Sequence, residues 1–237
     1  MIVAYEPFST VDYPGHIVAT VFFGGCNFRC GFCHNPALVN IEEKSETSPS
    51  NIQGIVDFLQ SRKGLLDGVC LTGGEPLLSP ELLSLVKKIK ELGTEEGNKA
   101  NKGQFKIKLD TNGSNLVRLQ QTAPYLDYIA MDIKATPEKY DALTGLKNSW
   151  EKVALTIEWI KESGIPYEFR TTVLPVWHTF EDLKSIRRYL GPDTNWVLQQ
   201  FREPPGGVLA QIKYEAYPDA WLKEIGQKLN CKVRGTR

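Results

Sequence analysis

The sequence predicts an α/β fold with a parallel sheet, in a single domain over residues 1–237. Short apolar runs that suit buried strands alternate with segments whose apolar residues recur every three or four positions, as in helices. About six such strand–helix units follow one another, an order typical of parallel sheets. No linker, repeat or low-complexity tract divides the chain, and its length suffices for one good-sized core. A doubly wound open sheet and an incomplete barrel both fit this pattern.

The expected elements follow from these patterns in chain order. Strands are predicted at Ile17–Phe23, Gly68–Thr72, Phe105–Asp110, Tyr128–Lys134, Tyr167–Leu174 and Trp196–Phe201. Helices are predicted from about Pro49, after Ser79, near Asn115–Gln121, from Thr136-Pro137, along Val153, Ile157 and Ile160 up to Gly164, at Glu181–Leu190 and at Ala220–Leu229.

The second of these helices carries the clearest boundary signals. Ser79 suits its N-cap, Pro80 its first position and Gly93 its end. The polar stretch Thr94–Gly103 that follows is expected to be a surface loop. The helix before it and this helix each repeat apolar residues on one face: Ile52, Ile55, Val56 and Leu59, then Leu82, Leu85, Val86 and Ile89.

Charge and targeting signals exclude several classes of protein. The 28 acidic residues balance 28 Lys and Arg, so there is no bulk electrostatic reason to expect nucleic-acid or anionic-membrane binding. The N-terminal stretch has no signal-peptide pattern, and the longest apolar run is too short to span a bilayer. We therefore expect a cytoplasmic protein, in which thiols stay reduced.

Active sites of parallel α/β folds gather at the carboxyl ends of the strands. The unusual residues of this chain fall at those ends. They are the cysteines Cys26, Cys30 and Cys33, the TGGEP stretch Thr72–Pro76, DTNG at Asp110–Gly113, MDIK at Met131–Lys134, RTTVLP at Arg170–Pro175 and QQFR at Gln199–Arg202.

The three clustered cysteines allow three interpretations. With His34 they would make a Cys3His zinc set, although Cys33 and His34 are adjacent and converge poorly on one ion. A redox pair needs only two thiols. An iron–sulfur cubane held by three thiolates would leave one iron open for a substrate or cofactor, and this interpretation is favoured. Cys70 and Cys231 are expected to be packing residues.

The other strand ends also have a structural and a functional interpretation. Gly73–Pro76 and Asp110–Gly113 are typical turns, but glycines also let a ligand approach the backbone, and Glu75 suits an ammonium group. Asp132 and Lys134 lie two apart and so share one face of a buried strand. They either pair with each other or meet a ligand carboxylate and a cation or hydroxyl.

Arg170 and two histidines are the remaining polar residues of interest. Arg170 lies on another strand that is expected to be buried, so it too either pairs with a neighbouring charge or meets a ligand. His16 and His178 are expected at the surface.

Taken together, these motifs resemble the radical S-adenosylmethionine family. The Cys26-x3-Cys30-x2-Cys33 loop, with Phe32 before the last cysteine, is similar to the signature of that family. Stretches from residue 11 to residue 235 resemble the activating proteins of anaerobic ribonucleotide reductase: VDYPG, GCNFRCGFCHNP, RKGLLDGV, TGGEPLL, KLDTNGS, DYIAMDIKA, YEFRTTVLP, LQQFR and VRG. Activating enzymes of pyruvate formate-lyase share several of them.

This resemblance implies an incomplete (β/α)6 TIM-like barrel and a set of cofactor contacts. It implies a 4Fe–4S cluster on Cys26, Cys30 and Cys33, completed by S-adenosylmethionine. The implied contacts of S-adenosylmethionine are Phe32, Cys33 and His34 at the adenine, Gly74, Glu75 and Asp110 at the amine, Lys134 at the carboxylate with Asp132 and Ile133 alongside, and Arg202 where relatives carry a His. A monovalent-cation site at Asp110, Thr111 and Asp132 is also implied.

The resemblance further implies the reaction and the partners. Reductive cleavage of S-adenosylmethionine would yield a 5′-deoxyadenosyl radical that takes hydrogen from a glycine of the partner. The implied partners are a glycyl-radical enzyme, foremost anaerobic ribonucleotide reductase, and a flavodoxin- or ferredoxin-type electron donor. The alternatives are pyruvate formate-lyase or another glycyl-radical enzyme as the target, a small-molecule substrate, and a zinc-stabilised binding module that is not an enzyme.

Overall fold

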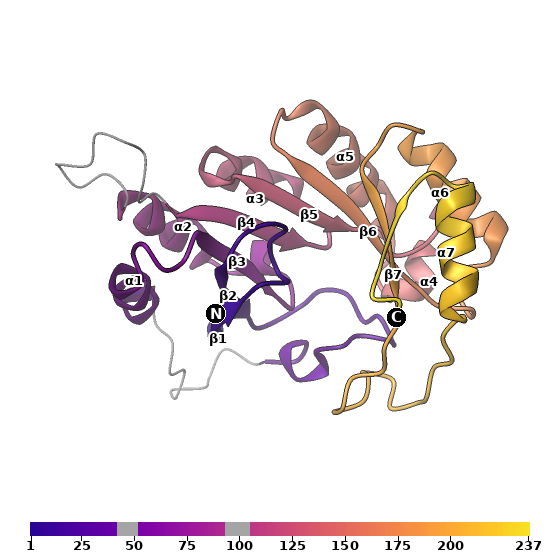
Figure 1. Ribbon diagram of the computed structural model, residues 1–237, viewed down its shortest axis with the longest axis horizontal. Coiled ribbons are helices and arrows are strands. Elements are labelled where there is room, and N and C mark those ends of the chain that lie inside the picture. Colours follow the sequence, from indigo (N-terminus) through magenta and orange to yellow (C-terminus); the bar gives the residue numbers. More distant parts are fainter. Residues whose placement is uncertain (42–51, 93–104) are drawn as a thin grey trace. The chain divides into compact units, whose positions relative to one another are not determined.

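The computed structural model describes residues 1–41, 52–92 and 105–237 (Figure 1). Its eight strands form one sheet. The strands lie side by side in the same order as they occur in the chain, from β1 to β8, so the sheet has two ends and is not closed. The predicted α/β fold with a mostly parallel sheet is confirmed. The chain divides into two compact units, the first made of Met1–Cys26, Ala37–Thr111 and Asn115–Ile129, the second of Asn27–Pro36, Asn112–Ser114 and Ala130–Arg237.

The first unit contains three parallel strands and one antiparallel strand. β2 (Val18–Phe23), β3 (Gly68–Gly73) and β4 (Lys106–Thr111) pair in parallel, and all three lie within two residues of their predicted bounds. β1 (Ile2–Ser9) runs antiparallel to β2 and was not predicted. Five consecutive residues in its middle are exposed, so it lacks the apolar run by which the other strands were recognised.

The helices of the first unit bury the apolar faces that the sequence predicts. α1 (Ile52–Ser61) buries Ile55, Val56 and Leu59, and α2 (Leu82–Glu91) buries Leu82, Leu85, Val86 and Ile89. α3 (Leu116–Thr122) is capped by the Asn115 side chain, which accepts a hydrogen bond from the Arg118 N–H. Short 3-10 turns lie at Pro76–Leu78 (η2) and Ala123–Tyr125 (η3).

One helix start differs from the prediction. Ser79 does not cap α2, and Pro80 is not its first residue, because Ser79 is the C-cap of η2 and α2 begins after Glu81. The Ser79 hydroxyl instead accepts a hydrogen bond from the N-terminal amine at 3.0 Å. The expected helix start near Pro49, the helix end at Gly93 and the loop Thr94–Gly103 lie outside the described residues.

The second unit continues the alternation of strands and helices. β6 (Tyr167–Val173), β7 (Trp196–Gln200) and β8 (Lys232–Arg234) pair in parallel. The helices of this unit are α4 (Pro137–Thr144), α5 (Ser149–Glu162), α6 (Phe180–Leu190) and α7 (Asp219–Lys228). β5 (Tyr128–Asp132) contributes residues to both units. Another short 3-10 turn, η1, lies at Pro36–Leu38.

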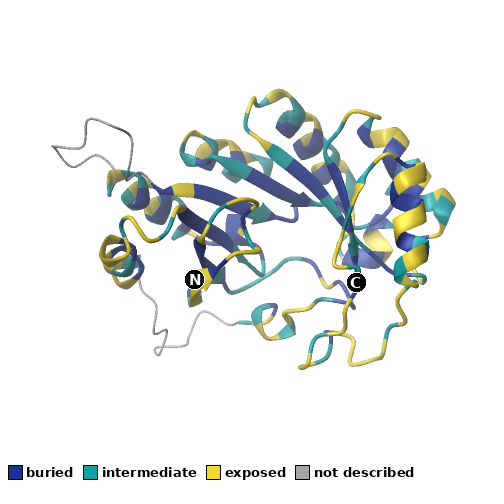
Figure 2. Cartoon of the chain, viewed as in Figure 1, coloured by how far each residue is buried: buried dark blue, intermediate teal, exposed yellow. Residues whose placement is uncertain are grey.

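Two local signals explain helix ends in the second unit. Thr136 precedes Pro137 at the start of α4, and Gly145 ends that helix in the left-handed region at φ 68°. At α6, Thr179 and Asp182 form a reciprocal capping box. β8 was not predicted, because three residues at the chain's polar end carry too little pattern. The strands are largely buried and the helices expose one side (Figure 2). No helix in the described ranges is long and apolar enough to cross a membrane.

Candidate functional site

The cysteine loop leaves the sheet at the end of β2. Gly25 has φ +88°, a conformation that glycine adopts without strain, and its N–H donates to the Leu38 carbonyl at 2.7 Å. A Cβ atom on Gly74 would collide with the Gly25 carbonyl, so glycine is required where the ends of β2 and β3 approach each other. The Cys26 N–H then donates to the Val39 carbonyl at 3.3 Å, which fixes the first cysteine of the loop in the first unit.

The other two cysteines of the loop belong to the second unit. The Cys33 N–H donates to the Cys30 carbonyl at 3.0 Å, so a tight turn joins them. Cys30 and Phe32 are buried, Cys26 and Cys33 are partly exposed, and all five cysteines of the chain are free of disulfides. Cysteine thiolates are the ligands that iron–sulfur clusters take. Among the described residues, neither unit alone gathers three or more His, Cys, Asp or Glu side chains into a metal-binding group.

His34 packs beside the last cysteine of the loop. Its ring stacks on Phe201 with a centroid distance of 5.3 Å and an interplanar angle of 30°. Burial lowers the pKa of His34, and Lys134 lowers it further, so the ring is neutral. The Arg202 guanidinium, which was expected near the adenosine, instead binds the Asp219 carboxylate at 2.9 Å and the Gly235 carbonyl at 3.0 Å, and it is exposed.

Glu75, at the end of β3, is fully buried. Its Oε1 accepts hydrogen bonds from the Leu77 N–H at 3.1 Å and from the Thr111 hydroxyl at 2.8 Å. The first bond caps η2, so Pro76 and its neighbours hold the carboxylate in place. The structure thus brings Glu75 and Thr111, predicted from two different strand ends, together in the first unit.

The end of β4 carries an ion pair that the sequence analysis did not find. Lys108, whose side chain is only 2% exposed, bonds the Asp110 carboxylate, and its ammonium lies 3.7 Å from the Cys70 sulfur. The signal was present, because Lys108 and Asp110 are two apart on a buried strand, as Asp132 and Lys134 are. Cys70 is buried in β3, as predicted for a packing residue.

The end of β5 carries a three-residue charge cluster in the second unit. The Asp132 carboxylate accepts from the Lys134 ammonium at 2.9 Å and from the Arg170 Nε at 2.9 Å. Of the two interpretations of Asp132 and Lys134, the structure shows the ion pair between them, with Arg170 as a further partner of Asp132. One carboxylate pairs with two cations here.

Attraction between opposite charges keeps Asp132 and Lys134 ionised although both are partly buried. Burial alone would raise the pKa of Asp132, but Arg170 and Lys134 outweigh it and hold that pKa well below its usual range. Burial alone would lower the pKa of Lys134, but Asp132 and the Cys30 thiol outweigh it and raise that pKa. Lys134 therefore stays charged and lies within electrostatic reach of Cys30.

His178 is fully buried, so the expectation that it lies at the surface was wrong. It follows the end of β6, in a turn that the His178 N–H closes on the Leu174 carbonyl. Its ring bonds the main chain of Lys134 and of Leu174. A lone histidine in the connection between a strand and a helix gives no sequence signal for such burial.

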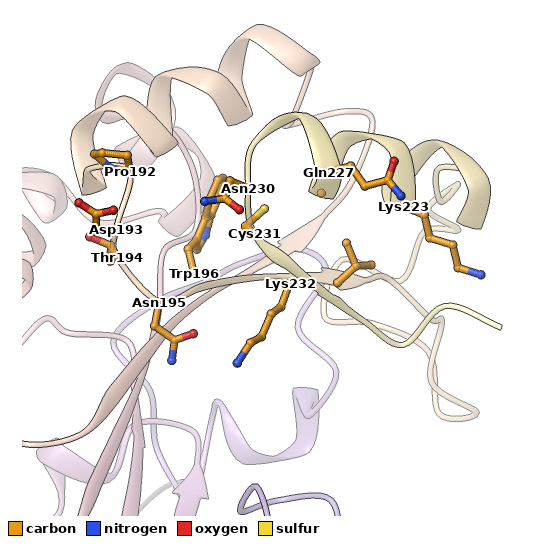
Figure 3. Close-up of a pocket in the computed structure, with 12 residues that line it drawn as sticks. Pro192, Asp193, Thr194, Asn195, Trp196, Lys223, Gln227, Asn230, Cys231 and Lys232 are labelled. Carbon is orange, nitrogen blue, oxygen red and sulfur yellow. The ribbon is translucent and has the colours of Figure 1, made fainter.

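An open cavity of about 780 Å³ lies at the amino ends of β7 and β8 in the second unit, whereas the motifs described above lie at carboxyl ends of strands (Figure 3). It is lined by the first residues of β7 and β8, Trp196 and Lys232, and by Cys231. Burial raises the pKa of the Cys231 thiol, so it is a poor nucleophile. No residue expected to bind a cofactor lines this cavity.

Comparison with known proteins decides the family. The sequence model of the Radical SAM superfamily matches residues 20–190. The chain belongs to this superfamily. Radical SAM enzymes use a 4Fe–4S cluster and S-adenosylmethionine as cofactors, and this chain is an enzyme of that kind.

Two curated relatives of this radical SAM enzyme are activating enzymes. One, from Methanocaldococcus jannaschii, is named "Putative glycyl-radical enzyme activating enzyme"; it is 28% identical over 227 residues, which are 92% of this chain and 87% of the relative. The other, a pyruvate formate-lyase-activating enzyme from Clostridium pasteurianum, is 30% identical over 189 residues, 78% of this chain and 72% of the relative. The chain is therefore homologous to glycyl-radical-enzyme activating enzymes.

The fold also matches solved radical SAM structures. SuiB of Streptococcus suis, crystallised with S-adenosylmethionine, superposes with a TM-score of 0.65 at 16% identity. The match covers 90% of this chain and 51% of SuiB, so the chain spans about half the length of that protein. At this identity the likeness supports the fold alone.

Proposed function

We propose that the chain is the activating enzyme of an anaerobic ribonucleoside-triphosphate reductase, on which it generates a glycyl radical. The observation that carries the proposal is the loop of three cysteines, none of them in a disulfide, at one strand end, in a chain homologous to glycyl-radical-enzyme activating enzymes over most of its length. The choice of the reductase rests on the resemblance of stretches along the whole sequence. Free cysteines throughout support a reducing compartment, the cytoplasm.

The three cysteines would hold the cluster, and the strand ends would hold S-adenosylmethionine. When bound, these cofactors supply one-electron cleavage of a carbon–sulfur bond. Cys26, Cys30 and Cys33 would bind three irons through thiolates. The main chain from Phe32 to His34 would contact the adenine, beside the His34 ring that Phe201 holds by stacking.

Formal charges support the assignment of the amino acid part of S-adenosylmethionine. In the second unit, Lys134 and Arg170 face one carboxylate, so Lys134 would bind the ligand carboxylate while Asp132 keeps Arg170 as a partner. Asp132 and Ile133 would lie alongside Lys134.

The strand ends of the first unit carry carboxylates. Glu75 and Asp110 would face the ligand's amine, with Gly74 leaving room for it.

Two further roles rest on the resemblance alone. Asp110, Thr111 and Asp132 would bind a monovalent cation. Arg202 would contact the adenosine only after releasing Asp219 and the Gly235 carbonyl, so its role is the least supported. We also propose that residues 1–237 act as one radical SAM domain, served by a flavodoxin- or ferredoxin-type electron donor.

A second target is supported by a specific relative. The pyruvate formate-lyase-activating enzyme of Clostridium pasteurianum is 30% identical to this chain. Pyruvate formate-lyase is therefore the alternative substrate. Both targets present a glycine on a protein backbone, so the chemistry of the site is the same for both.

The proposal is tested in two stages. Protein reconstituted without oxygen should bind iron and sulfide and cleave S-adenosylmethionine when reduced. Cys30→Ala should lose both properties, whereas Cys231→Ala, a control outside the loop, should keep them. Cleavage by Cys30→Ala, or zinc in place of iron in the wild-type protein, would contradict the cluster assignment.

The second stage identifies the target. The reconstituted enzyme is mixed in parallel with an anaerobic ribonucleotide reductase and with a pyruvate formate-lyase. A glycyl-radical doublet in the electron paramagnetic resonance spectrum should form with the reductase. A doublet with the formate-lyase alone would overturn the choice of target and leave the enzyme class intact.

A further inference from the structure

The ring of His178 is held in one orientation and one tautomer. Its Nε2 lies 2.9 Å from the Lys134 carbonyl, and its Nδ1 lies 3.2 Å from the Leu174 N–H. A carbonyl only accepts and an N–H only donates, so Nε2 carries the proton and Nδ1 does not. Burial lowers the pKa of His178 to about 4, in agreement with a neutral ring.

The surroundings of His178 keep the ring from moving. Its own N–H donates to the Leu174 carbonyl at 2.8 Å and closes a turn directly after β6. The Tyr217 hydroxyl donates to the His178 carbonyl at 3.0 Å. The capping box of α6 begins at the next residue, Thr179. His178 is therefore a fixed point between β6 and α6.

The segment that His178 contacts leads out of β5 and carries the charge cluster. All four main-chain polar groups of Ile133 and Lys134 are bonded within the second unit. The Ile133 N–H donates to the Arg170 carbonyl and its carbonyl accepts from the Thr171 hydroxyl. The Lys134 N–H donates to the Tyr140 hydroxyl at 3.3 Å, and the Lys134 carbonyl accepts from His178.

We propose that His178 is a positioning residue that fixes the main chain of Lys134, so that the Lys134 ammonium is placed to bind the carboxylate of an amino acid ligand. The inference rests on the proposed function in naming S-adenosylmethionine as that ligand. Lys134 lies beyond the last residue of β5, so sheet hydrogen bonds do not hold it. Without the bond from His178, the partly buried Lys134 carbonyl would lose its partner, and the segment would shift to reach another donor.

Two variants of His178 each keep one of the two hydrogen bonds of its ring and remove the other. In His178→Gln the side-chain amide nitrogen sits near the position of Nε2 and still donates to Lys134. In His178→Asn the amide oxygen sits near the position of Nδ1 and still accepts from Leu174, but the bond to Lys134 is lost. His178→Leu removes both bonds. A residue that only fills space would not distinguish Gln from Asn.

The binding test uses anaerobically reconstituted protein and S-adenosylmethionine as the probe. Asn and Leu variants should bind it about 10- to 100-fold more weakly than wild type, while the Gln variant stays within about threefold. Iron content should be equal in all four proteins, and hydrogen exchange at the Leu174 amide should be fast in Gln and slow in Asn. Wild-type affinity in the Asn variant, or equal weakening in Gln and Leu, would overturn the proposal.

A measurement on protein without cofactors separates this inference from the proposed function. The chain has three histidines, so its 15N-histidine spectrum is simple to assign. His178 should show a slowly exchanging Nε2 proton. If the wild type binds no S-adenosylmethionine, the proposed function fails, and a slow Nε2 proton still supports the bond to Lys134. A proton on Nδ1, or fast exchange, overturns the inference whatever the protein binds.

Discussion

The ends of β4 and β5 carry the same two residue types at the same spacing but in opposite order. In β4 the lysine comes first, so Lys108 lies inside the strand with 2% of its side chain exposed and Asp110 lies nearer the strand end. In β5 the aspartate comes first, so Lys134 lies beyond the strand and is 19% exposed. The lysine is the less exposed member of both pairs, since the side chains of Asp110 and Asp132 are 16% and 28% exposed, but Lys134 is more exposed than Lys108.

The two pairs also differ in the partners that can be named. Lys108 pairs with Asp110, and Asp132 pairs with Arg170 as well as with Lys134. Lys134 is thus able to turn to a ligand without leaving Asp132 unneutralised. We infer that the pair at β4 mainly stabilises the first unit and that the pair at β5 is built to bind an anionic group.

The largest effect is expected from removing the enclosed ammonium. Lys108→Met should lower the free energy of unfolding by about 3 kcal/mol, because it removes the buried ammonium that bonds the partly buried Asp110 carboxylate. Lys134→Met should lower it by about 1 kcal/mol, because Asp132 keeps Arg170. Urea unfolding of the protein without cofactors measures both. Equal losses would remove the proposed difference between the two strand ends.

A smaller effect concerns the pH dependence of stability through His178. Its folded-state pKa of about 4 lies below the usual value of a histidine, so the unfolded chain binds the proton more tightly. The stability that neutral His178 contributes is present above the unfolded pKa of about 6.5 and is lost as the pH falls toward 4.

Between pH 7 and pH 5 this loss should be about 2 kcal/mol. His178→Gln, which does not titrate, should lack that part of the pH dependence. Urea unfolding of the wild type and the variant at the two pH values gives the comparison. The same slope in both proteins would mean that His178 is not buried in its neutral form.

The smallest effect is expected at Arg202. Its guanidinium is exposed and bound to Asp219 and the Gly235 carbonyl, unlike the partly buried Lys134. Arg202→Ala should leave the affinity for S-adenosylmethionine within about threefold of wild type, because exposed ion pairs contribute little. Equilibrium binding to the reconstituted protein checks this. A tenfold or greater loss would support the contact of Arg202 with the adenosine.

The parallel strands could be predicted because buried strands are continuous apolar runs, and each run here ends in a turn signal. β1 and β8 could not, since an edge strand with exposed residues and a three-residue strand are stabilised by pairing rather than by their own pattern. The start of α2 was predicted too early. Ser79 and Pro80 resemble the first residues of a helix, but Ser79 is the C-cap of the preceding 3-10 turn.

Within the candidate site, residues on one strand were easier to predict than residues that meet through the fold. The alternation of side chains placed Asp132 and Lys134 on one face, and the same rule would have found Lys108. The bond between Thr111 and Glu75 and the burial of His178 depend on contacts between segments far apart in the sequence. No local pattern specifies such contacts.

The central claim is that Lys134, and not Lys108, binds the carboxylate of the ligand. The most direct test compares the affinity for S-adenosylmethionine with that for its decarboxylated form in the wild type, Lys134→Met and Lys108→Met. The ratio of the two affinities in Lys134→Met should be at least about tenfold smaller than in the wild type, and Lys108→Met should keep the wild-type ratio. An unchanged ratio in Lys134→Met would contradict the claim.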